Sequence, residues 1–124
     1  MAYRPQAPRL TDMIEAIERV LHVTEDLSLE GFEADWEKQW LVQRGVEIIS
    51  EASRHLSDEL KLRYPEIPWR KVAGVGNVLR HEYGDIAAPV LWGIVREQLP
   101  ALGKVCREEL AVEGGQERSD GSTA

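Results

Sequence analysis

The chain has 124 residues, of which 43% are hydrophobic and 30% are charged, so it can form one domain around one core. Its formal net charge of −7 argues against a protein that coats nucleic acid through a general basic surface, although it is compatible with a local cationic site. One cysteine and short apolar runs exclude an intramolecular disulfide and a membrane span. No apolar segment typical of a signal peptide follows the first residues, so we expect a cytoplasmic protein.

The first helix is predicted from an apolar stripe that runs from Leu10 to Leu27 in steps of three and four residues. Thr11 or Asp12 can cap its N-terminus, and we expect an extended arm up to Pro8 before it. The polar side chains between the stripe residues would form the exposed side of this helix.

A second, longer helix is predicted over residues 35–62, again from a continuous apolar stripe. Gly45 lies inside it, and an interior glycine costs a helix about 1 kcal/mol relative to alanine, so we expect a packing reason for this residue. Trp36 and Trp40 are four residues apart, and we expect them to pack in the core or in a dimer interface, since an aromatic side chain buries much area.

The third helix should begin at Pro68, where a proline costs nothing, and end near residues 83–84. Asp85 can cap a fourth helix, which Pro100 is expected to interrupt before a short last helix. We see no β-hairpin signal, so the sequence predicts an all-α bundle of four to five helices. We assign residues 1–112 to this domain and residues 113–124, which are polar and rich in Gly and Ser, to a disordered tail.

A cluster of cations stands out in this acidic chain, formed by Arg70, Lys71, Arg80 and His81. On a helix, Asn77 and His81 lie one turn apart on the same face, and Arg80 borders that face. Histidine beside a guanidinium and an amide can bind a phosphodiester and move protons near neutral pH. The same cations would also suit a purely structural role at a helix C-terminus, where they interact favourably with the helix dipole.

Several motifs stand out along the chain, namely Glu47-Ile48-Ile49-x-Glu51-Ala52, Tyr64-Pro65-Glu66-Ile67-Pro68-Trp69, Gly74, Asn77, His81-Glu82-Tyr83, Val90-x-Trp92 and Leu99-Pro100. Together they resemble the HepT-like branch of the HEPN superfamily, and the resemblance covers about residues 8–105. The resemblance implies a HEPN-type bundle of four to five helices that forms a homodimer.

The same resemblance implies a function. HepT-like proteins are toxins of toxin–antitoxin pairs, act as metal-independent endoribonucleases on RNA, and have a minimal nucleotidyltransferase as antitoxin. His81 matches the catalytic histidine of this family, and Asn77 matches the polar residue that follows the motif arginine. Tyr83 matches the tyrosine that the antitoxin modifies with a nucleoside monophosphate. We therefore expect no metal and no other cofactor.

One position departs from the family pattern. The arginine expected directly before Asn77 is Gly76 in this chain. An arginine there would hold the scissile phosphate and the charge that develops on it. Arg80 is one replacement, and Arg70 is another as a phosphate-binding residue, although Arg70 lies about 16 Å from His81 along a straight helix.

The departure leaves two other interpretations open beside an active ribonuclease. In the first, the chain is a catalytically degenerate HEPN binding module that partners a nucleotidyltransferase or is nucleotidylated by it on Tyr83. In the second, it is a helical dimer with an unrelated scaffold role, in which Asn77, His81 and Tyr83 can change without functional consequence.

Overall fold

The computed structural model describes residues 6–81 and 88–122, and for residues 80, 81 and 115–122 it describes the backbone alone. All of the regular structure in these ranges is helical, which confirms the all-α class. The elements are α1 (Ala7–Thr24), α2 (Leu29–Glu33), α3 (Trp36–Arg54), α4 (Asp58–Arg63), α5 (Trp69–His81), α6 (Ala88–Gly93), the π-helical segment η1 (Ile94–Gln98) and α7 (Leu99–Ser122).

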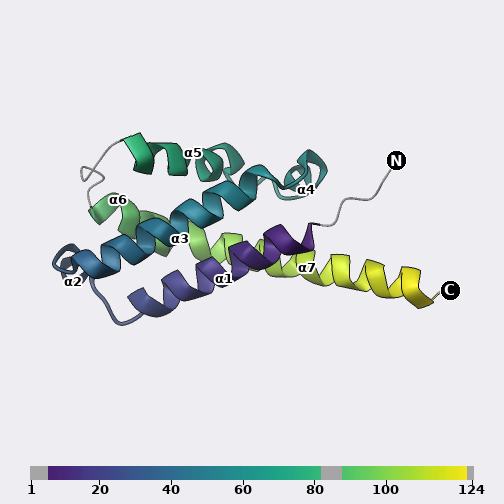
Figure 1. Ribbon diagram of the computed structural model, residues 1–124, viewed down its shortest axis with the longest axis horizontal. Helices are drawn as coiled ribbons and strands as arrows, with labels where there is room; N and C mark the ends of the chain where they lie inside the picture. Colours follow the sequence, from purple (N-terminus) through teal and green to yellow (C-terminus); the bar gives the residue numbers. More distant parts are fainter. Residues whose placement is uncertain (1–5, 82–87, 123–124) are drawn as a thin grey trace.

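The helices pack in a simple order across the bundle (Figure 1). Helix α3 lies between α5 and α1, and α1 in turn lies between α3 and α7. Successive long helices run in opposite directions, so the C-terminal half of α3 faces the middle of α5. No helix of the described residues combines the length and apolarity that a membrane crossing requires.

The core is built mainly from the apolar stripes of α1, α3 and α7, and the other helical elements add further buried side chains. Cys106 of α7 belongs to it, and burial raises the pKa of its thiol to about 12, so this cysteine fills space and is no nucleophile near neutral pH. The largest fully buried hydrophobic side chains are Phe32, Leu10, Met13, Ile17, Ile49, Leu60, Leu91, Leu102, Val42 and Val95.

Helix α1 begins at Ala7, earlier than the cap predicted at Thr11 or Asp12, and Pro8 lies in its first turn instead of in an extended arm. The reason is a long-range cap. One carboxylate oxygen of the buried Glu113 accepts hydrogen bonds from the backbone N–H groups of Gln6 and Ala7, at 2.6 and 3.0 Å. A carboxylate satisfies orphan N–H groups and favours the positive end of the helix dipole.

The single helix predicted over residues 35–62 is wrong, because α3 ends at Arg54 and α4 starts at Asp58. Ser57 caps α4 by accepting a hydrogen bond from the N–H of Leu60 at 3.1 Å. The Ser57 N–H in turn donates to the Gln6 side chain at 2.8 Å. The apolar stripe continues across this break, which is why periodicity alone missed it.

Pro100 does not end the helix that precedes it. Instead, α6, η1 and α7 follow one another without a break, and the N–H of Leu99 reaches back five residues to the carbonyl of Ile94. A proline ring collides with the carbonyl four residues earlier, here that of Arg96, and the wider π turn makes room for it.

The predicted core position of the first two tryptophans is wrong for the single chain. Trp36 and Trp40 are 61% and 67% exposed on α3, and their rings meet edge to face with centroids 5.2 Å apart. Packing of this pair in a dimer interface stays a prediction. The boundary at residue 112 likewise stays a prediction, while the backbone of α7 is helical through Ser122.

An ion pair ties the short α4 to α7. Arg63 donates two hydrogen bonds to the carboxylate of Glu109, at 3.0 and 2.8 Å, and the Tyr64 hydroxyl donates a third at 3.0 Å. Glu109 is buried, whereas half of the Arg63 side chain is exposed. The bonds from Arg63 hold the pKa of Glu109 below its usual value, although burial acts in the opposite direction.

Candidate functional site

Helix α5 carries most of the residues that the sequence nominates for chemistry. Its start is anchored by Trp69, whose indole N–H donates to the carbonyls of Lys61 and Tyr64 at 3.2 and 3.0 Å. The helix begins at Trp69, one residue after the predicted Pro68, and the carbonyl of Pro68 accepts the N–H of Val72 at 3.0 Å. The helix continues to His81, the last residue described before residue 88.

The structure places Asn77 and His81 close together on α5 and places Arg70 apart from them. Asn77 is exposed and lies one helical turn before His81, so the backbone places both on the last two turns of α5. Arg70 is exposed in the first turn, about 16 Å from His81 along the axis, and is not part of this group. The side chains of Arg80 and His81, and all of Tyr83, lie outside the described part of the chain.

Gly76 lies at the contact between α5 and α3. Its N–H donates to the hydroxyl of Ser50 at 3.2 Å, and that hydroxyl donates to the carbonyl of Ala73 at 2.8 Å. A Cβ atom at position 76 would lie 2.9 Å from the Ser50 Oγ and 3.3 Å from its Cβ. A side chain at this position would therefore force Ser50 to shift and would disturb its bonds to Gly76 and Ala73, so the close packing of Ser50 favours glycine here.

Arg54, at the end of α3, reaches across to the same stretch of α5. Its Nε and Nη2 atoms donate to the carbonyl of Ala73 at 3.1 and 2.8 Å. Its Nη1 atom contacts a carboxylate oxygen of Glu51 at 3.3 Å, and the other oxygen of Glu51 lies 3.2 Å from the His55 ring. A guanidinium from another helix thus lies against the middle of α5.

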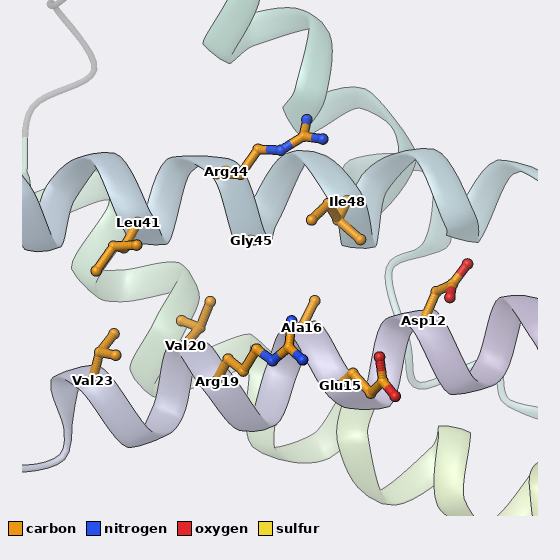
Figure 2. Close-up of a pocket in the computed structure, with 10 residues that line it drawn as sticks. All are labelled: Asp12, Glu15, Ala16, Arg19, Val20, Val23, Leu41, Arg44, Gly45 and Ile48. Carbon is orange, nitrogen blue, oxygen red and sulfur yellow. The ribbon is translucent and has the colours of Figure 1, made fainter.

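A separate groove of about 320 Å³ lies between α1 and α3 (Figure 2). Its two carboxylates and two guanidiniums balance in charge, and every lining residue belongs to α1 or α3, so the groove does not include the residues of α5. Gly45 lines it, and a Cβ atom there would overlap the side chain of Val20, which confirms the predicted packing reason for this glycine. The lining residues are Asp12, Glu15, Ala16, Arg19, Val20, Val23, Leu41, Arg44, Gly45 and Ile48.

Residues 13–109 match the family model described as ribonuclease HepT-like. The chain belongs to this family. A protein of Thermococcus cleftensis named "Probable ribonuclease HepT" is 40% identical over 93 residues, which are 75% of this chain and 84% of that protein. A protein of Methanocaldococcus jannaschii named "Putative RNase MJ1380" is 33% identical over 104 residues, which are 84% of this chain and 95% of that protein. No solved structure matches the chain.

Membership of the HepT-like family confirms the resemblance found in the sequence, and the structure adds a residue that sequence reasoning missed. Arg54 and Arg44 both lie on α3, and each has a glutamate three residues away, Glu51 and Glu47. This local pattern gives no signal that separates the two arginines. Only the packing of α3 on α5 sets Arg54 apart, because its side chain bonds to the other helix.

Proposed function

We propose that this chain is a metal-independent endoribonuclease that cleaves single-stranded RNA in the cytoplasm. The observation that carries the proposal is the family match over residues 13–109, which includes α5 with Asn77 and His81 one turn apart. Relatives that cover most of the chain bear ribonuclease names, which supports RNA as the substrate class.

The proposed reaction is an internal transfer at phosphorus. The RNA 2′-OH loses its proton and attacks the adjacent phosphorus, the bond from phosphorus to the 5′-oxygen breaks, and that oxygen takes up a proton. The products are a cyclic phosphate and a 5′-OH. His81 is the residue that takes or gives a proton, because an imidazole titrates near neutral pH. Asn77 orients the phosphate, and Arg80 stabilises the charge that develops on it.

We further propose that the chain is the toxin of a type VII-like toxin–antitoxin system, acts as a homodimer and is neutralised by a minimal nucleotidyltransferase. The resemblance to the HepT-like branch supports this role. The exposed pair Trp36 and Trp40 supports an interface with a second protein chain, since large exposed aromatic side chains mark interaction surfaces.

Purified protein incubated with a labelled single-stranded RNA tests the ribonuclease proposal. We expect cleavage that persists in excess EDTA and leaves cyclic phosphate and 5′-OH ends. The control is the same RNA with every 2′-OH replaced by 2′-O-methyl, which removes the nucleophile and should resist cleavage. Activity that EDTA abolishes, or products with 3′-OH ends, would contradict the proposal.

A second candidate function is favoured by Gly76, which replaces the motif arginine and is buried against Ser50. In this case the chain is a degenerate HEPN module, and Tyr83 accepts a nucleoside monophosphate from the nucleotidyltransferase. Incubation with a cognate minimal nucleotidyltransferase, ATP and magnesium should then add the mass of a nucleoside monophosphate to the intact chain. The same incubation with Tyr83→Phe should add none, and equal addition to both proteins would exclude Tyr83 as the acceptor.

A further inference from the structure

The guanidinium of Arg54 occupies a defined place beside the proposed site. Its Nη2 atom lies 3.6 Å from the point where a Cβ atom of residue 76 would be. The carbonyl of Ala73 that it contacts belongs to the residue four positions before Asn77, so the guanidinium lies against α5 about one helical turn before Asn77. His81 follows Gly76 by five residues, which is about 7.5 Å along the helix axis.

From this geometry we infer that Arg54 is a phosphate-binding residue for RNA that lies along α5, and that it supplies from α3 the guanidinium that Gly76 does not. The inference rests on the proposed ribonuclease function and adds Arg54 to the residues named there. An RNA strand that passes His81 along α5 would pass this guanidinium too.

The side chain of Arg54 is both held in place and accessible. Its bonds to the Ala73 carbonyl fix the plane of the guanidinium, while one third of the side chain is exposed. A guanidinium has five N–H donors, and three of them bond to the described residues Ala73 and Glu51. One N–H group of Nη1 and one of Nη2 therefore remain for a phosphate.

Glu51 is the group that competes with a phosphate for Arg54. Its side chain is 56% exposed, and its contact with Arg54 is a surface ion pair, which is a weak interaction. A phosphate that approaches the exposed edge of the guanidinium can therefore displace this carboxylate. Removal of the Glu51 charge should then strengthen RNA binding, which is the opposite of the effect expected for Arg54.

The chain offers a matched control on the same helix. Arg44 is 73% exposed and pairs with Glu47 at 3.7 Å, and it lines the groove between α1 and α3. Arg44→Gln and Arg54→Gln change the net charge of the protein equally. They differ in whether the lost guanidinium contacts α5, so a difference between them reports on position and not on total charge.

The test measures binding of a single-stranded 2′-O-methyl RNA, which binds without cleavage, at several salt concentrations. We expect Arg54→Gln to weaken binding about tenfold. Loss of one phosphate contact should also make the slope of log K against log salt shallower by about 0.7. Arg54→Lys, which keeps the charge but not the fork, should retain the slope, and Arg44→Gln should match the parent. A merely structural role of Arg54 would not change the slope, and melting temperatures show whether each variant is folded.

The inference would be overturned if the slope of log K against log salt were the same for the parent, Arg54→Gln and Arg44→Gln. It would also be overturned if both variants lost the same amount of RNA affinity. In either case, cleavage of ordinary RNA by the parent would leave the ribonuclease proposal standing. A parent that neither binds nor cleaves RNA would overturn both. If Arg54→Gln does not fold, Glu51→Gln replaces it: binding about twofold to fivefold tighter than that of Glu47→Gln supports the inference, and equal binding overturns it.

Discussion

Replacement of His81 by alanine is expected to lower the rate of RNA cleavage by about 10²- to 10⁴-fold, the usual contribution of a positioned general acid or base. Imidazole is the side chain whose ordinary pKa lies nearest to neutral pH, so no neighbour on α5 can take over its proton transfer. The same change should abolish the toxicity of the protein. The measurements are cleavage kinetics with purified protein and growth after induced expression in cells that lack the antitoxin.

His22→Ala is the matched control for His81→Ala. His22 is a highly exposed histidine of α1 that faces Glu25 at 3.6 Å and lies on a helix that the proposed site does not use. We expect this variant to cleave RNA and to inhibit growth like the parent. Undiminished cleavage by His81→Ala would contradict the proposed mechanism. Harmless expression of a folded parent protein would favour the degenerate binding module and make modification of Tyr83 the next question.

Replacement of Arg63 by methionine is expected to destabilise the protein by about 2 kcal/mol at pH 7. Loss of one partner of a fully buried ion pair costs about 3–5 kcal/mol, and the cost is smaller here because half of the Arg63 side chain is exposed. The variant leaves the buried carboxylate of Glu109 with only the hydroxyl of Tyr64 as a hydrogen-bond donor among the three bonds described. Urea unfolding at pH 7 measures the difference, with Arg44→Met as the exposed control.

The effect of Arg63→Met should shrink as the pH falls. Arg63 lowers the pKa of Glu109 in the folded protein below its ordinary value of 4.5. The unfolded chain therefore binds more protons in the acidic range, and the stabilisation is complete above pH 4.5 and is lost as the pH falls through the lowered pKa. Urea unfolding repeated at acidic pH should bring parent and variant closer together. A difference that stays constant between pH 7 and pH 3 would show that Arg63 stabilises the fold through packing and not through the carboxylate.

Local pattern was sufficient for the fold class and for the part of the site that lies on one helix. The period of three to four residues predicted that the chain is helical, although it missed the break between α3 and α4, and Pro68 and Trp69 marked the start of α5. Asn77 and His81 come one turn apart because spacing along a helix is a property of the backbone alone. The motifs around these residues indicated the HepT-like family, which the match over residues 13–109 confirms.

Contacts between distant segments were decided only by the tertiary structure. The carboxylate of Glu113 sets the start of α1, although more than a hundred residues separate them. The close approach of Ser50 favours glycine at position 76, and the same packing brings Arg54 onto α5. The sequence by itself therefore determined the helical class, the family and the spacing of Asn77 and His81, because these depend on neighbours along the chain. Only the packing of α3 on α5 decided which arginine contacts α5, because a bond between side chain and backbone of two different helices does not show in the periodicity of either sequence.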